Sequence, residues 1–193
     1  MGIAWEWHNV DNRKSALAFE TERLAAAKAG DRGALERLLS EYEGPLYALC
    51  RGMLDRCDDA EDAVQETFLR AIRNIRKFQG KAQLRTWLHR IAVNICLDVR
   101  RRHRPAVELA TAAERPDQRC LEKDVIHRIR VEKALQSLPP RRRAIFLLKE
   151  LEGWSGAEIG QIMGCRESLV YYELKEAVRA LAKWRSANEG DIK

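Results

Sequence analysis

The sequence predicts an all-α protein made of two small helical domains joined by a flexible linker. Apolar residues recur mainly at spacings of three and four, the period of an amphipathic helix, and few alternate as they would along a strand. This helical pattern stops after Pro105 and resumes near Lys123. A chain of 193 residues is long enough for one domain or for two small ones. The interruption favours two.

Charge is distributed unevenly along the chain. The net charge of +6 and the pI of about 9.2 point only mildly to a polyanionic partner, because an ordinary basic protein has similar totals. The placement of the charge is more informative. Asp55–Glu66 holds six acids and one base, whereas Lys81–Arg104 holds seven bases and one acid. An acidic helix followed by a basic helix predicts one protein-facing surface and one phosphate-facing surface.

Several classes of function lack their sequence signatures. The five cysteines are odd in number and form no CxxC pair, and the four histidines are scattered, so we expect no disulfide framework, metal or cofactor. No Gly-rich phosphate loop or nucleophile–histidine arrangement points to an enzyme. The sequence also shows no signal peptide and no apolar run of membrane-spanning length. We therefore expect a cytoplasmic protein without direct membrane insertion.

The predicted first domain covers residues 16–105 and follows an N-terminal extension, residues 1–15, that lacks clear periodicity. Its first helix begins near Ser15. Gly30 is a suitable C-terminal stop for that helix, and Asp31 is a suitable N-cap for the next. Pro45 falls inside the apolar pattern of this next helix, where it predicts a kink or a break.

The helix after the acidic turn has a polar face with one apolar residue at its centre, Leu69. An isolated exposed leucine is common on protein surfaces. A leucine framed by polar groups is also typical of an anchor for a partner protein. From the residues alone, the first interpretation is favoured. The predicted buried stripe of this helix consists of Ala63, Val64, Thr67, Phe68, Ala71, Ile72 and Ile75.

A loop at residues 77–83 leads into the basic helix. In this loop Phe78 lies beside lysines, a combination that stacks on single-stranded nucleic acid or that simply plugs a turn. The run Arg100–Arg104 favours phosphate contact over a merely solvated basic face. The predicted core face of the helix is Leu84, Trp87, Leu88, Ile91, Ala92, Ile95 and Val99. Off that stripe lie Arg85, His89, Arg90, Asn94, Arg100 and Arg101.

Residues 106–122 lack a sustained apolar stripe and are predicted to be the linker. The predicted second domain covers residues 123–187 and is followed by a short tail, residues 188–193. Its first helix is broken by Pro139 and Pro140, and its second ends at Gly153.

A helix-turn-helix is predicted to follow. Ser155 and Glu158 form a capping box at the start of its first helix, and Gly164 marks the turn. The last helix is expected to bury Leu169, Val170, Leu174, Ala177, Val178 and Leu181. Its exposed start, the end that enters a DNA major groove in such motifs, carries Arg166, Glu167, Ser168, Tyr171, Tyr172 and Lys175.

Two parts of the chain resemble bacterial sigma factors of the extracytoplasmic-function (ECF) group in the sigma-70 family. The segments DAEDAVQETFLRAIRNI, FQGKAQLRTWLHRIAVNICLD and RRR are similar to sigma region 2. LPPRRRAIFLLKELEGWS is similar to region 4, where the usual form is LPxxxRxxFxLxxxEGxS. The resemblance implies a sigma region 2 helical bundle in the first domain and a sigma region 4 helix-turn-helix in the second.

The resemblance also implies a function and partners. It implies a non-enzymatic subunit that directs promoter-specific transcription initiation with core RNA polymerase, through the beta-prime clamp helices and the beta flap. It implies promoter DNA and an inhibitory anti-sigma factor as further partners. The alternative is a stand-alone helix-turn-helix regulator. That alternative explains the last helices but leaves DAEDAVQETF and the loop at Phe78 without a role.

Three sets of contact residues follow from the pattern and the resemblance together. The core-polymerase set is Asp59, Asp62, Gln65, Glu66, Leu69 and Arg73. The minus-ten set is Phe78, Gln79, Gly80, Lys81, Arg85, His89, Arg90, Asn94, Arg100 and Arg101. The minus-thirty-five set is Arg166, Glu167, Ser168, Tyr171, Tyr172 and Lys175.

The last helix departs from the family pattern. The usual sequence GTVKSRL is replaced by SLVYYEL, so that Tyr171 stands where the family has lysine and Glu173 where it has arginine. Fewer cations mean weaker electrostatic attraction to DNA. We expect either an unusual minus-thirty-five sequence or a greater dependence on polymerase for DNA binding.

Overall fold

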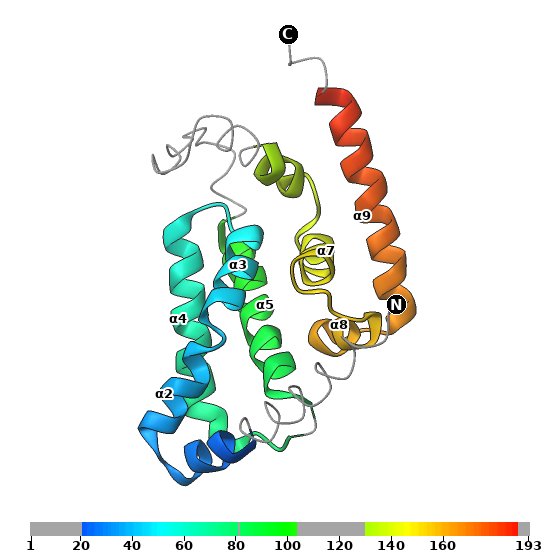
Figure 1. The fold of residues 1–193 in the computed structure, drawn as a ribbon. Helices are drawn as coiled ribbons and strands as arrows, with labels where there is room; N and C mark the ends of the chain where they lie inside the picture. Colours follow the sequence, from blue (N-terminus) through cyan, green and yellow to red (C-terminus); the bar gives the residue numbers. More distant parts are fainter. Residues whose placement is uncertain (1–20, 81, 104–129, 189–193) are drawn as a thin grey trace, which may run out of the picture.

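The computed structural model describes residues 21–80, 82–103 and 130–188, and all regular structure within these ranges is helical (Figure 1). The helices are α2 (Arg32–Ser40), α3 (Glu43–Met53), α4 (Cys57–Asn74), α5 (Leu84–His103), α7 (Pro140–Glu152), α8 (Gly156–Met163) and α9 (Glu167–Asn188). The short 3-10 helix η1 (Ile75–Lys77) extends α4, and residues 21–29 and 130–136 are also helical. The prediction of an all-α fold is confirmed. The expected N-terminal extension and linker, residues 1–15 and 106–122, lie outside the described residues.

The predicted helix boundaries of the first group are largely correct. Gly30 has a φ of 104°, which favours glycine, and the Asp31 side chain accepts a hydrogen bond from Ala34 N at 3.0 Å. The predicted break near Pro45 lies between α2 and α3. Pro45 itself occupies the first turn of α3, where a missing N–H removes no intrahelical hydrogen bond.

Helices α4 and α5 lie side by side and are joined by the loop at Phe78 (Figure 1). Small residues of α4, among them Ala63 and Ala71, are buried. The prediction that Ile72 is buried is wrong, because its side chain is 47% exposed. Consecutive helix residues point about 100° apart. Since Ala71 faces the core, Ile72 turns toward solvent beside Leu69.

Helices α7, α8 and α9 form the second group and include the predicted helix-turn-helix. Gly153 and Gly164 end α7 and α8 with positive φ values of 66° and 63°. The capping box of Ser155 and Glu158 is present in full. A Cβ atom at Gly160 would lie 2.8 Å from the Cys165 carbonyl oxygen, so only glycine fits where α8 meets the turn.

The apolar stripe of α9 is narrower than its sequence predicts. Leu169 and Val178, predicted to be buried, are 39% and 58% exposed. The fully buried residues of this helix are Val170 and Ala177. They lie two turns apart on one line. Helix α9 packs on α7 and α8, and this contact covers only the strip that contains them.

The two helical groups pack against each other, which the sequence pattern does not predict. Helix α3 lies against α7, and α5 lies against α8, so that one continuous apolar core runs through both groups (Figure 1). Helix α5 is therefore covered on two sides. Gly52 of α3 permits this approach, because a Cβ atom there would lie 2.8 Å from the side-chain methyl carbons of Leu147.

Candidate nucleic-acid and protein interfaces

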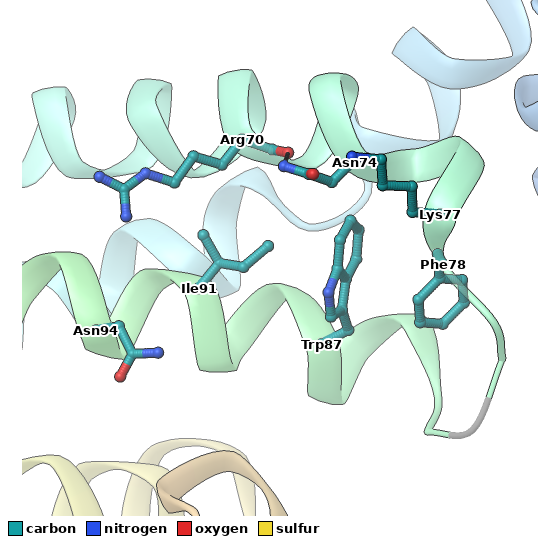
Figure 2. Close-up of a pocket in the computed structure, with 7 residues that line it drawn as sticks. All are labelled: Arg70, Asn74, Lys77, Phe78, Trp87, Ile91 and Asn94. Carbon is teal, nitrogen blue, oxygen red and sulfur yellow. Dashed lines mark hydrogen bonds between the residues drawn. The ribbon is translucent and has the colours of Figure 1, made fainter.

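A cavity of about 350 Å³ opens between α4 and α5 near the loop at Phe78 (Figure 2). The Phe78 and Trp87 ring centroids are 5.0 Å apart, with the rings tilted by 37°. Lys28 Nζ lies 5.3 Å from the Phe78 centroid. Aromatic surface, amides and cations thus converge on one opening, a combination suited to holding an unstacked base and its phosphate. The cavity is lined by Arg70, Asn74, Lys77, Phe78, Trp87, Ile91 and Asn94.

Of the cavity residues, the sequence predicts Phe78 and Asn94 as nucleic-acid contacts and assigns Trp87 and Ile91 to the core. The prediction missed the residues that α4 and η1 contribute, Arg70, Asn74 and Lys77. A signal for them exists in the sequence. Residues 70, 74 and 77 have the same spacing as residues 87, 91 and 94, and each series forms one stripe of its helix. The two stripes form opposite walls of the cavity (Figure 2).

A second feature is the exposed face of α4. Leu69 is 47% exposed, as the sequence pattern predicts, and Ile72 beside it is exposed to the same extent. Around this apolar pair, Asp62, Gln65 and Arg73 are exposed, whereas Asp59 and Glu66 are half-buried. Glu66 Oε1 accepts a hydrogen bond from Arg70 Nε at 2.7 Å. An apolar pair framed by polar groups is the pattern of an anchor at a protein interface.

On the other side of α5, two of the expected DNA contacts are covered by the second helical group. His89 is fully buried, so its predicted exposure is wrong for this arrangement of the helices. Its Nε2 lies 2.7 Å from Glu152 Oε1, and its Nδ1 lies 2.8 Å from Arg85 O. Arg85 Nη2 donates to Glu152 Oε2 at 2.7 Å. His89 is buried because the C-terminal end of α7, which is far away in sequence, packs over it and supplies the Glu152 carboxylate as its partner.

Trp154 completes this cluster of Arg85, His89, Glu152 and Trp154, which we call the α5 cover. The Arg85 guanidinium lies 3.8 Å from the Trp154 ring centroid, and the His89 ring meets the indole edge-on at 4.9 Å. Burial alone would raise the pKa of the Glu152 carboxyl. The hydrogen bonds and positive charges of His89 and Arg85 outweigh burial, and they lower this pKa below its ordinary value of 4.5.

Arg100 is also engaged within the protein. Its Nη1 donates to Met53 O at 3.0 Å and lies 3.3 Å from Asp55 Oδ1. Arg143 of α7 reaches the same two residues, with Nη1 3.1 Å from Met53 O and 3.4 Å from Asp55 Oδ1. Burial and repulsion by Arg100 lower the pKa of Arg143 to about 10, although Asp55 partly opposes this. With that pKa Arg143 stays charged at neutral pH, and both arginines hold the C-terminal end of α3.

The rest of the minus-ten set lies at the surface. Gln79, Gly80, Arg90, Asn94 and Arg101 are exposed, and Arg101 pairs with Asp98 on its own helix. Gly80 has a φ of 69°, a value that favours glycine in this loop. Lys81 lies outside the described residues.

The start of α9 presents the whole minus-thirty-five set to solvent, from Arg166 to Lys175. Tyr171 Oη donates to Glu167 Oε1 at 3.2 Å. Glu173, which stands where the family has arginine, is paired within the protein. Its Oε2 accepts a hydrogen bond from Arg142 Nε at 2.7 Å and joins α9 to α7.

Comparison with known proteins identifies the family. The family model for Sigma-70 region 2 matches residues 38–106, and that for Sigma-70, region 4 matches residues 128–181. The ECF RNA polymerase sigma factor SigM of Mycobacterium tuberculosis is 34% identical over 169 residues, covering 85% of this chain and 83% of SigM. The chain belongs to the ECF sigma factors. SigW of Bacillus subtilis, another ECF RNA polymerase sigma factor, is 28% identical over 176 residues, covering 84% of this chain and 94% of SigW.

Solved structures show the same fold. CnrH, determined in complex with the cytosolic domain of CnrY, matches with a TM-score of 0.71 at 22% identity, covering 88% of this chain and 99% of CnrH. The sigma factor RpoE of Bartonella quintana, determined with the anti-sigma factor NepR, matches with a TM-score of 0.62 at 23% identity, covering 79% of this chain and 97% of RpoE.

As an ECF sigma factor, the protein is a transcription initiation factor that acts with core RNA polymerase at promoter DNA. The expectation of an ECF sigma factor, drawn from the family resemblance, is therefore confirmed. Among the described helices, none combines the length and the apolar character needed to cross a membrane.

Proposed function

We propose that residues 16–105 act as the sigma region 2 domain and residues 123–187 as the region 4 domain, joined by the linker at residues 106–122. The first domain binds core polymerase and opens the minus-ten element, and the second reads the minus-thirty-five element. The protein itself makes and breaks no covalent bond. It acts in the cytoplasm, where it meets core polymerase.

The polymerase contact is the exposed face of α4. Leu69 and Ile72 supply an apolar centre, and exposed polar side chains such as Asp62 and Gln65 supply the rim. A partner helix that covers Leu69 and Ile72 gains the burial of two aliphatic side chains, each worth about 1.5–3 kcal/mol when fully buried. The carboxylates of Asp59 and Asp62 favour basic groups on that partner.

The cavity between α4 and α5 and the residues that line it are the observation that carries the proposal for DNA opening. In this proposal the cavity holds one unpaired base of the minus-ten element on the non-template strand. Trp87 and Phe78 offer stacking surface, and Asn74 and Asn94 offer amide groups that hydrogen-bond to base edges. Arg70 and Lys77 stand at the same opening and attract the flanking phosphates.

The start of α9 lies in the major groove of the minus-thirty-five element. Tyr171 and Tyr172 replace cationic contact with aromatic contact to phosphates and thymine methyl groups. Because Glu173 is paired with Arg142, it lowers the net charge of this surface without facing the DNA. Binding at this element should therefore be less salt-dependent than in family members that carry lysine and arginine there.

An anti-sigma factor controls this activity. The proposal is supported by RpoE, a fold relative determined together with its anti-sigma factor NepR. In this chain, the exposed apolar pair on α4 is a surface for which such an inhibitor and core polymerase would compete.

Run-off transcription tests the proposal. Core bacterial RNA polymerase, the purified protein and the DNA upstream of its own gene should give discrete transcripts. The double variant Gln65→Ala/Leu69→Ala should lose them, because the centre of the α4 face is removed. A matched control, Arg32→Ala/Glu36→Ala, replaces two exposed residues of α2 outside all proposed contacts and should transcribe as the wild type does.

The assay also distinguishes the alternative function. Binding of duplex DNA without polymerase, together with no transcript when polymerase is added, would indicate a stand-alone regulator and contradict the proposal. Equal transcription by both double variants would mean that the polymerase contact lies elsewhere than on α4.

A further inference from the structure

Glu152, the last residue of α7, binds two residues of α5 at a position that would also suit a DNA phosphate. Its two carboxylate oxygens lie 2.7 Å from Arg85 Nη2 and from His89 Nε2. Arginine and histidine are common phosphate ligands, and two oxygens shared between two such groups is also how a phosphate binds. Any phosphate that reaches Arg85 and His89 must therefore first displace Glu152.

Trp154 packs against the same two residues of α5 that Glu152 binds, Arg85 and His89. Its ring lies 3.8 Å from the Arg85 guanidinium, within the range of a cation–π contact. The α7–α8 junction thus places an anion and an aromatic ring on the basic helix together. This arrangement satisfies the same groups that we assign to the minus-ten strand.

Two side chains that join the second helical group to the first, those of Arg143 and Trp154, are buried with polar atoms left unpaired. Among the described residues, the buried side-chain nitrogens without a hydrogen-bond partner are Arg143 Nε, Arg143 Nη2 and Trp154 Nε1. Both residues belong to the second helical group and face the first, Arg143 at the end of α3 and Trp154 at α5. Unpaired buried N–H groups oppose closure. Opening would let water reach these groups, which offsets part of the apolar contact that holds the two helical groups together.

We propose that Glu152 is a built-in competitor of promoter DNA, so that the two helical groups must separate before α5 binds the minus-ten strand. This inference rests on the proposed function of α5. In the closed protein, His89 is buried and the guanidinium of Arg85 is held by Glu152 and Trp154, while the cavity between α4 and α5 stays open. Free protein therefore binds minus-ten DNA weakly, and separation of the groups uncovers the remaining contacts.

The first test compares Glu152→Gln with Glu150→Gln in the full-length protein. Both variants remove one negative charge from α7, but Glu150 is exposed and lies outside the α5 cover. The probe is a fluorescent single-stranded DNA. It has the sequence of the non-template strand across the minus-ten element, which lies upstream of the transcription start mapped by run-off transcription. Glu152→Gln should bind it about tenfold more tightly than wild type, because a charged hydrogen-bonded pair is lost. Glu150→Gln should bind as wild type does.

Small-angle X-ray scattering of the same samples reports the separation directly. The radius of gyration should increase for Glu152→Gln and stay unchanged for Glu150→Gln. Equal affinities of the two variants for the strand would overturn the proposal. An increase in radius without tighter binding would overturn it as well.

Gly52→Gln opens the protein by a different route and leaves Arg85, His89 and Glu152 intact. The new side chain would collide with Leu147 when the two helical groups are packed together. When they are separated, this face of α3 is exposed, and glutamine there favours the helix. This variant should also show a larger radius and tighter strand binding. A larger radius with wild-type affinity would contradict the proposed competition.

Run-off transcription separates this inference from the proposed function. If wild type transcribes and Glu152→Gln matches Glu150→Gln in strand binding, the competition is wrong and the proposed function stands. If wild type gives no transcript at all, the assignment of α5 to promoter DNA is wrong, and the competition falls with it.

Discussion

The two sides of α5 have opposite environments. On one side, Trp87, Ile91 and Asn94 face α4 across an open cavity of about 350 Å³. On the other, Arg85 and His89 meet Glu152 and Trp154 and are closed off from solvent to different degrees, His89 completely. Each side combines an aromatic ring with polar groups.

The difference shows that local pattern alone does not determine which polar residues of a helix reach solvent. His89 lies off the predicted apolar stripe, so helical periodicity assigns it to the surface. A buried imidazole needs a hydrogen-bonding partner. Glu152 is that partner, 63 positions along the chain. Cover by a second domain is a long-range property, and it reverses the local expectation.

Trp154→Ala should have the largest effect on stability. The indole is 1% exposed and packs on both Arg85 and His89. Truncation of a buried aromatic residue typically costs about 3–5 kcal/mol of unfolding free energy. Urea denaturation followed by circular dichroism measures this loss. Trp184→Ala, which truncates a half-buried tryptophan of α9, is the control and should cost clearly less. Equal losses would mean that the α5 cover adds little to stability.

Trp87→Ala should affect transcription more than stability. This ring is half-buried at the cavity, so its loss should destabilise the protein less than Trp154→Ala does. Stacking of a base on an aromatic side chain is worth about 1–3 kcal/mol, so run-off transcription should fall roughly 5- to 150-fold. Trp87→Phe should restore much of the activity because a ring remains. Full transcription by Trp87→Ala would exclude the cavity as the base-binding site.

Acid should loosen the covered side of α5. The lowered pKa of Glu152 means that its ionised form stabilises the folded, closed protein. That stabilisation is fully present above the ordinary value of 4.5 and is lost as the pH falls through the lowered pKa. The titratable groups around it are Arg85 and His89 on α5 and, near Arg85, Glu158 on α8, whose pKa is also lowered by its bonds to Ser155.

The measurement is the unfolding free energy of wild type minus that of Glu152→Gln, followed from pH 7 to pH 3. The difference should shrink as the pH falls below 4.5, and the Glu158 contribution should cancel because both proteins contain it. A difference that stays constant with pH would show that the Glu152 carboxylate does not stabilise the closed protein.

Much of the fold could be predicted from the sequence because its signals are local. Gly30, Gly153 and Gly164 end helices with positive φ, and Ser155 with Glu158 forms the predicted capping box. The errors at Ile72, Leu169 and Val178 have one physical cause. Each lies at the edge of an apolar stripe, and its exposure depends on the width of the contact that covers the stripe, which periodicity does not report.

The candidate sites were predictable only in part for a similar reason. Phe78 is predicted as a nucleic-acid contact because it stands beside lysines in a loop, and Asn94 because it lies off the apolar stripe of the basic helix; both line the cavity. Arg70, Asn74 and Lys77 were missed because their role depends on the pairing of α4 with α5 (Figure 2). The core-polymerase and minus-thirty-five residues are at suitable positions on the surface, and their contacts stay predictions.

The last prediction compares two glutamates of the second helical group. Glu173 pairs with Arg142 within that group, whereas Glu152 pairs with Arg85 and His89 across to the first. The Arg142–Glu173 side chains are 23% and 20% exposed, so the pair should contribute about 1 kcal/mol. Glu173→Arg should lose this amount, and the charge swap Arg142→Glu/Glu173→Arg should recover it in thermal denaturation.

Strand binding then separates the two roles. Neither the single Glu173 variant nor the swap should change the affinity of free protein for the minus-ten strand, because their contact lies away from α5 and holds α9 to α7. Glu152→Gln should tighten that binding at little cost to either helical group. If loss of Glu173 tightened binding as much as loss of Glu152, general negative charge on the second domain, rather than one carboxylate placed on α5, would be what keeps the strand away.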